Sequence, residues 1–503
     1  MRNVSIVVVA LAAAGCKASP VATPPPPVDP CRNGEVLCIT PSTIKNKVDM
    51  LFVLDDSPTM AAALGAWRAS LPHLVSKIGS LADVGSPVSF HFGAITADLG
   101  AGPETLAALG CHPGGDNGKL HSGNVALTGG VRFVDDNQLA GTTNFTGDLA
   151  AALDALSDVG TSGCAFPSPL EAAYRALHDF VPENAAFLRS DALLVVVFVT
   201  NGDDCSAPAT SDLSDPSSTK YGALDRFRCT QFGIACGGNP VPPMAVSGLT
   251  GCESQTMASG GKLIDVQKYV DFFDKPAAQG GVKVDPQDVI LAGVTAPIDP
   301  VGVTITSPCA ADASVASCPQ LNHSCESPSD PRFFGDPAVR LDAVIASART
   351  NDLVSVCSGS DDSLVDSIRN ALFSRASAGC LQTPLAARSD GTADCLVDDV
   401  TAHADGSTTV SDVPSCAENG HVIPCWDLVD RLPQYDAQGC MPSSVGVPAT
   451  CKLPLSCQPV TGADGKRELY SLDIDRGLTA AGTPNPAPPG TTTHIECATI
   501  PTP

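Results

Sequence analysis

One apolar segment near the start of the chain limits its possible folds more than any other feature. Residues Lys47–Leu54 read KVDMLFVL, and the last four of them are all apolar. An apolar run without alternation is typical of a strand in a parallel sheet that is covered on both faces. After a short polar turn, apolar residues recur at helical spacing from Met60 to Ile78. The order of strand, turn and helix therefore predicts an α/β domain.

Later segments repeat this alternation of strands and helices. Strands are predicted at residues 88–96, 193–200 and 289–294, and helices at residues 169–180, 264–273 and 363–373. Such alternation favours a doubly wound, mostly parallel sheet. The helix at 363–373 is expected to be the last element of this domain, which then spans residues 46–376.

Three stretches without such periodicity interrupt the predicted domain, near residues 97–145, 201–260 and 297–335. Each contains cysteines and many Gly, Pro, Asp and Ser residues. We interpret them as insertions whose cysteines staple loops that have little core of their own. Residues 377–503 hold short apolar runs between turn residues, together with eight cysteines. This pattern predicts a small, β-rich, cysteine-rich C-terminal module.

The first sixteen residues, MRNVSIVVVALAAAGC, predict export. A basic start, a short apolar run and small residues before Cys16 form an export signal, and the run is too short to span a membrane. The end of this segment resembles the lipobox of bacterial lipoproteins, in which the cysteine is acylated. The resemblance implies a signal peptide over residues 1–15 and lipidation of Cys16. It also implies a place in the cell envelope, with Lys17 favouring the outer membrane. The proline-rich composition after Cys16 predicts a stiff linker that carries the lipid anchor, over residues 16–45. Ordinary secretion after cleavage nearby is the alternative.

Cysteine content and charge narrow the possible compartments and partners. The chain has 503 residues and 21 cysteines, and without Cys16 an even number of cysteines remains. An even number is expected of disulfides that form outside the cytoplasm. The net charge of −25 excludes nucleic acid as a partner, because the chain offers no basic surface to neutralise phosphates.

The turn after the first strand carries the clearest chemical signal. Asp55-x-Ser57-x-Thr59 follows a predicted parallel strand, and the carboxyl ends of such strands form the edge at which open sheets bind ligands. A carboxylate and two hydroxyls at alternating positions can converge on one hard cation such as Mg²⁺. In the alternative interpretation, Asp55 and Thr59 only cap the helix that follows.

These residues resemble the DxSxS motif of von Willebrand factor type A domains, with threonine in place of the final serine. The resemblance covers about residues 45–375, because strand, motif, helix and a later strand follow in the family's order. It implies a Rossmann-like fold and a metal-ion-dependent adhesion site that binds Mg²⁺, Mn²⁺ or Ca²⁺. The family's second loop supplies a threonine, which implies Thr161 as a ligand, with Ser162 or Ser168 as alternatives.

The third loop departs from the family's pattern. The family usually has Thr-Asp-Gly after its later strand, whereas this chain has Thr200-Asn201-Gly202. Asn201 thus stands at the position of a ligating aspartate. Its amide oxygen can bind a cation, but one negative charge is lost, so metal affinity falls unless Asp203 or Asp204 reaches the ion.

The expected function is therefore binding and not catalysis. We expect a cell-envelope lipoprotein that binds an acidic group of a surface protein or glycan through a divalent metal, and that contacts the membrane through its lipid anchor. The chain has no GxSxG, HExxH or phosphate-binding loop that would indicate an enzyme. One alternative is a structural envelope protein with a degenerate, metal-free type A fold. A less favoured one is an extracellular hydrolase.

Overall fold

The computed structural model describes residues 36–39, and residues 47–376 apart from 84–87, 102–109, 139, 180, 210, 216–218 and 310–314. Beyond these it describes 380–381, 385, 393–402, 408–430, 460–461, 467–468, 470–477 and 491–498. The predicted signal peptide, Cys16 and most of the predicted linker lie outside these residues. Within the described part, no helix is long and apolar enough to cross a membrane.

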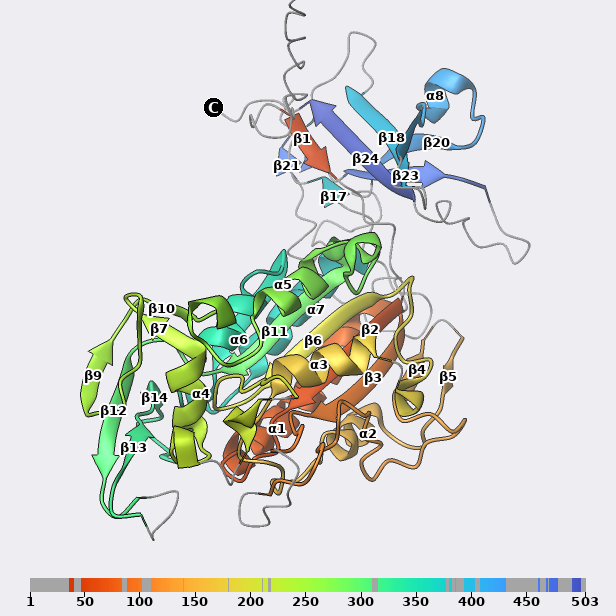
Figure 1. Cartoon of the computed structure of the whole chain (residues 1–503). Coiled ribbons are helices and arrows are strands. Elements are labelled where there is room, and N and C mark those ends of the chain that lie inside the picture. Colours follow the sequence, from red (N-terminus) through yellow and green to blue (C-terminus); the bar gives the residue numbers. More distant parts are fainter. Residues whose placement is uncertain are drawn as a thin grey trace, which may run out of the picture.

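A seven-stranded sheet forms the centre of the large domain, with the strand order β16-β11-β6-β2-β3-β4-β5 (Figure 1). Five of its strands run parallel to one another. They are β2 (Lys47–Leu54), β3 (Ser89–Thr96), β6 (Leu193–Val199), β11 (Val289–Thr295) and β16 (Thr350–Ser355). The four strands predicted from the sequence are confirmed as β2, β3, β6 and β11. The fold is thus mixed α/β with a mostly parallel sheet.

Helices cover both faces of this sheet. One face packs against α1 (Ala61–Asp83), α2 (Leu149–Leu156) and α7 (Asp362–Ala376). The other packs against α3 (Pro169–His178), α5 (Gln267–Asp274) and α6 (Val339–Ile345). Because side chains alternate along a strand, Phe52 of β2 belongs to the first core and Leu51 to the second. This two-sided burial explains the unbroken apolar run of β2, and α3, α5 and α7 confirm the predicted helices.

The predicted insertion at 97–145 is partly a component of the sheet. β4 (Val134–Asn137) pairs antiparallel with β3, and β5 (Thr142–Thr143) pairs with β4. The prediction of an insertion is therefore wrong for the end of this stretch. β4 reads VDDN, which is too short and too polar to show a strand pattern in the sequence.

The other two insertions carry small sheets of their own. Residues 201–260 contain α4 (Arg226–Gly233) and a three-stranded sheet of β7 (Ile234–Cys236), β8 (Asn239–Pro240) and β10 (Cys252–Ser254). A second three-stranded sheet joins β9 (Val246–Leu249) to β12 (Val301–Thr306) and β13 (Cys318–Leu321). Disulfides staple these regions, as predicted: Cys111–Cys164, Cys205–Cys229, Cys236–Cys252, Cys309–Cys318 and Cys325–Cys357.

The described C-terminal segments are β-rich, as predicted. A four-stranded sheet has the order β1-β24-β18-β19, from β1 (Val36–Ile39), β24 (Thr491–Ala498), β18 (Cys395–Ala402) and β19 (Thr408–Asp412). Disulfides Cys395–Cys497 and Cys416–Cys425 staple this module. β1 comes from residues predicted to be linker and pairs antiparallel with β24. The linker prediction is thus wrong for these four residues, whose sequence VLCI is apolar enough to join a sheet.

Candidate functional site

The loop of residues 55–59, here called the Asp55 loop, lies at the carboxyl end of β2, as predicted. Asp55 and Ser57 are both buried, whereas Thr59 is exposed. The backbone N–H of Ser57 donates to Asp55 Oδ1 at 2.9 Å, and the backbone N–H of Asp55 donates to the carbonyl of Val199 at 2.9 Å. These bonds hold the Asp55 loop against the end of β6.

The loop after β6 completes this edge of the sheet. Thr200 donates a hydrogen bond from Oγ1 to Asp55 Oδ2 at 2.7 Å. Thr59 Oγ1 donates to Asn201 Oδ1 at 3.3 Å. Four of the five predicted ligands, Asp55, Ser57, Thr59 and Asn201, are therefore brought together by the fold.

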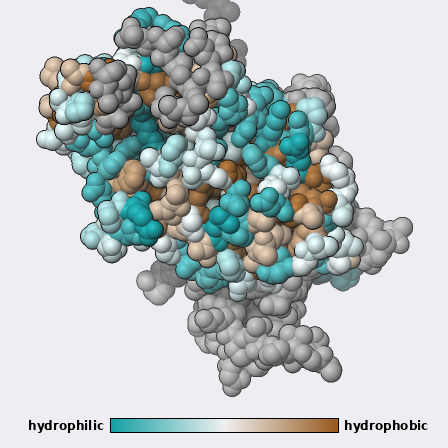
Figure 2. Space-filling model, turned by 90° about the horizontal axis from the view of Figure 1, so that it is seen from below, coloured by the Kyte–Doolittle hydropathy of each residue, from teal (hydrophilic) through white to brown (hydrophobic). Residues whose placement is uncertain are grey.

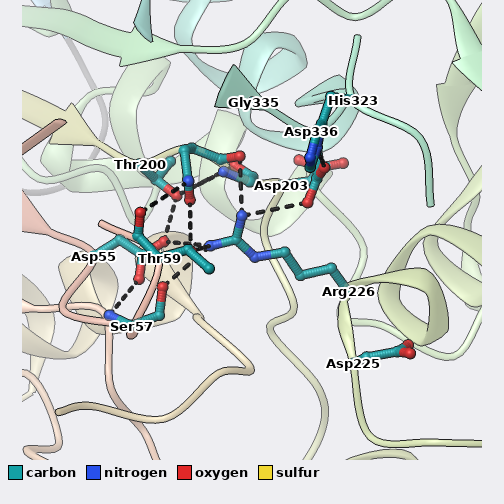
Figure 3. Close-up of polar contacts among 12 residues, drawn as sticks. Asp55, Ser57, Thr59, Thr200, Asp203, Asp225, Arg226, His323, Gly335 and Asp336 are labelled. Carbon is teal, nitrogen blue, oxygen red and sulfur yellow. Dashed lines mark hydrogen bonds and ion pairs between the residues drawn. The ribbon is translucent and has the colours of Figure 1, made fainter. Parts of the chain in front are cut away.

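A guanidinium group occupies the point on which these residues converge (Figure 3). Nη2 of Arg226 lies 3.3 Å from Asp55 Oδ2, 3.1 Å from Ser57 Oγ and 3.2 Å from Thr59 Oγ1. Nη1 of the same residue donates to the carbonyl of Asn201 at 3.0 Å and to Asp336 Oδ2 at 3.3 Å. The Arg226 side chain is only 15% exposed. The three side-chain oxygens of the Asp55 loop thus surround a cation that the chain itself provides.

The ligand atoms of this site are of the chemical type that a hard metal cation binds. A carboxylate, two hydroxyls and a nearby amide oxygen are ligands that Mg²⁺ accepts. Magnesium binds oxygen at about 2.0–2.1 Å, so the Asp55 loop would have to contract by about 1 Å around the ion. The guanidinium would also have to leave, because it fills the same position.

Thr161, the fifth predicted ligand, makes no hydrogen bond to the Asp55 loop among the described residues. It is half-buried. Its loop approaches Asp56 instead, since the N–H of Gly163 donates to the Asp56 carbonyl at 2.9 Å. Of the two alternatives, Ser162 is exposed, and Ser168 donates its backbone N–H to the carbonyl of Ala97.

Asp203 and Asp204 are turned towards α6 and not towards the Asp55 loop. Asp203 accepts the backbone N–H groups of Arg340 and Leu341, each at 3.0 Å, at the start of that helix. Burial raises the pKa of Asp203 to about 6, although Arg340 opposes the shift. Asp204 Oδ2 pairs with Arg340 Nη2 at 3.0 Å. Both carboxylates therefore serve the packing of α6.

An open cavity of about 390 Å³ adjoins the Asp55 loop and shares Ser57, Thr59 and Arg226 with it. Its walls are mostly apolar and include Leu224, Phe227, Leu321 and Phe334. His323 Nδ1 lies 2.7 Å from Asp336 Oδ1 at its polar end, and this hydrogen bond raises the pKa of His323. From below, the surface shows hydrophobic residues in hollows between hydrophilic ones (Figure 2).

Sequence reasoning missed Arg226 and Asp336. Arg226 is 167 positions from Thr59 and belongs to a predicted insertion, so no local pattern relates it to the Asp55 loop. Arg226 directly follows Asp225, the N-cap of α4. This local sequence predicts only the start of a helix and no contact with the Asp55 loop.

A second group of ligand-type residues lies in the C-terminal module. Cys416, His421 and Cys425 are close enough together to hold a metal ion. However, Cys416 and Cys425 form a disulfide, so neither sulfur is available as a thiolate ligand.

Comparisons with known proteins add little to this geometry. The chain matches no known protein family and no curated protein. Among solved structures, the pilus adhesin RrgA of Streptococcus pneumoniae aligns with 92% of this chain at 10% identity and a TM-score of 0.28. The adhesive tip pilin GBS104 of Group B Streptococcus agalactiae aligns with 92% at 10% identity and a TM-score of 0.26. The chain covers 58% of RrgA and 79% of GBS104. Similarity at these TM-scores does not establish a shared fold.

Proposed function

We propose that this chain is a ligand-binding protein of the cell envelope that recognises an acidic group of a surface protein or glycan through a divalent cation. The observation that carries the proposal is the convergence of three side-chain oxygens of the Asp55 loop on one cation position. Asp55, Ser57 and Thr59 would hold Mg²⁺, Mn²⁺ or Ca²⁺, and the Asn201 amide would bind the ion or a ligating water. The bound ion would supply an open coordination position for the ligand's carboxylate. The proposal assigns the chain no catalytic role.

The strand order supports a von Willebrand factor type A-like arrangement for the domain. β2 lies in the middle of the sheet, with β6, β11 and β16 following on one side and β3 and β4 on the other. Helices lie on both faces, and the Asp55 loop is at the carboxyl edge. In open α/β sheets, the crevice where the strand order reverses is the usual place for a ligand. β2 is the strand at which this chain reverses.

A structural, metal-free role is the second candidate, and two observations favour it. Arg226 already places a positive charge beside Asp55, and Asn201 removes a negative charge that a divalent ion would use. In this alternative, Arg226 only ties the 201–260 insertion to the sheet.

Calorimetric titration with MgCl₂ separates the two candidates. We expect the purified, disulfide-intact protein to bind Mg²⁺ and Asp55→Ala to lose that binding. Asp330→Ala is the matched control, because Asp330 pairs with the exposed Arg332 and should leave binding unchanged. The variant Asn201→Asp should bind more tightly. If the parent, Asn201→Asp and Arg226→Gln all give no binding heat, the structural role is the correct one.

The lipid anchor is a separate proposal with its own test. Seven disulfides among the described residues support a location outside the reducing cytoplasm. Cys16→Ala should release the protein from the membrane fraction or block its processing. An unchanged membrane fraction would show that Cys16 carries no anchor.

A further inference from the structure

We infer that Arg226 is a tethered cation that competes with the divalent metal for the Asp55 loop, so that metal binds only when the Arg226 side chain swings out. The inference rests on the proposed function and extends it, because it names the residue that sets the metal affinity of the site.

The contacts of Arg226 show that the two cations exclude each other. Its Nη2 lies 3.1 to 3.3 Å from the three oxygens that would ligate the metal. An ion within about 2.1 Å of those oxygens would overlap Nη2 and repel its charge. A metal ion and the guanidinium therefore cannot share the Asp55 loop.

Two neighbouring features hold the Arg226 side chain beside the Asp55 loop. The disulfide Cys205–Cys229 joins α4 to the segment after β6, which fixes the helix that begins with Arg226. A Cβ atom on Gly202 would lie 2.9 Å from Cζ of Arg226, so the absence of a side chain there leaves room for the guanidinium. Tethering in this way gives the guanidinium a high effective concentration at the Asp55 loop.

The adjoining cavity gives the displaced side chain a place to go. Arg226 and Asp336 both line this cavity of about 390 Å³, and Arg226 Nη1 already lies 3.3 Å from Asp336 Oδ2. The guanidinium can therefore rotate out of the Asp55 loop and keep its ion pair with Asp336. No unfolding of α4 is required.

With such competition, the apparent metal affinity equals the intrinsic affinity multiplied by the fraction of molecules in which the guanidinium is out. Any ligand that binds only the metal-loaded site must also displace Arg226. The site then binds neither metal nor ligand when the concentrations of both are low. Bound metal and bound ligand each strengthen the binding of the other.

Calorimetric titration with MgCl₂ tests this competition. We expect Arg226→Gln to bind Mg²⁺ at least tenfold more tightly than the parent, because its side chain is uncharged. Arg226→Lys keeps a positive charge on the tether, so its affinity should stay closer to that of the parent. Arg332→Gln, which changes an exposed arginine elsewhere, should match the parent.

The outcomes separate this inference from the proposed function. Equal Mg²⁺ affinity in the parent and Arg226→Gln overturns the inference and leaves the proposed function intact. Absence of binding in every variant overturns the proposed function. If Arg226→Gln fails to fold, Gly202→Ala gives a second test, since its methyl group should displace the guanidinium and also tighten Mg²⁺ binding.

Discussion

Thr200 donates a hydrogen bond from Oγ1 to Oδ2 of Asp55 at 2.7 Å, although 145 positions separate the two residues in the chain. Both side chains are buried. The bond joins the loop after β6 to the loop after β2 and fixes the direction of the Asp55 carboxylate. The position of the Asp55 carboxylate in the Asp55 loop therefore depends on this bond.

Removal of the Thr200 hydroxyl should destabilise the domain. We expect Thr200→Val to lower the free energy of unfolding by about 1.5–3 kcal/mol, because Asp55 loses a buried hydrogen bond to its charge. Urea denaturation measures the loss. Thr200→Ser retains the hydroxyl and should lose much less, and equal losses in the two variants would contradict this role for the bond.

The buried pair of Arg340 and Asp204 should be more costly to break. Their side chains are 1% and 0% exposed, and Nη2 lies 3.0 Å from Oδ2. Arg340→Met leaves Asp204 as an uncompensated buried charge, which should cost about 3–5 kcal/mol of unfolding free energy. The exposed Arg332 provides the control, since Arg332→Met should leave the urea midpoint in place. A similar midpoint for both variants would show that the buried pair is dispensable.

Asp361 should make the domain less stable as the pH rises. Burial, with a smaller contribution from Asp362, raises the pKa of Asp361 from 3.8 to about 7, and its Oδ2 is buried without a hydrogen-bond partner among the described residues. A carboxyl whose pKa is raised by folding binds its proton more tightly in the folded state. Its cost to stability is therefore absent below pH 3.8, grows between pH 3.8 and about 7, and is constant above that range.

Asp361→Asn should remove this cost. We expect a gain of roughly 2–4 kcal/mol at pH 8 and almost none at pH 4, measured by urea denaturation at both pH values. Asp361 directly precedes α7. Asn is also a good residue at the N-terminal cap of a helix, so this substitution should preserve the start of α7. A gain of the same size at both pH values would mean that Asp361 does not titrate as described.

Loss of a disulfide should cost more where the closed loop is longer. Cys111–Cys164 spans 53 positions and Cys309–Cys318 spans 9. From chain entropy alone, replacing both cysteines by serine should cost about 4 kcal/mol for the first bond and about 2.5 kcal/mol for the second. Thermal unfolding under non-reducing conditions should rank the variants in that order. The reverse order would mean that the loops keep structure without their bonds.

The strands at the centre of the sheet could be predicted because burial on both faces leaves a local signal. β6 is a continuous apolar run and β2 ends in one from Met50 to Leu54, and the predicted limits of both strands agree with the structure to within one residue. β16 reads TNDLVS and pairs only with β11, at one edge of the sheet. An edge strand is covered less completely, so its sequence resembles that of a loop, and it was not predicted.

The sequence by itself determined the Asp55 loop, because a buried strand, three oxygen-bearing residues and a helix follow one another within a few positions. Only the tertiary structure decided what occupies the point between those oxygens. Arg226 reaches it from an insertion whose course depends on a disulfide and on packing against distant strands. Local patterns encode backbone geometry over a few residues, whereas contacts across more than a hundred positions depend on how the whole chain packs.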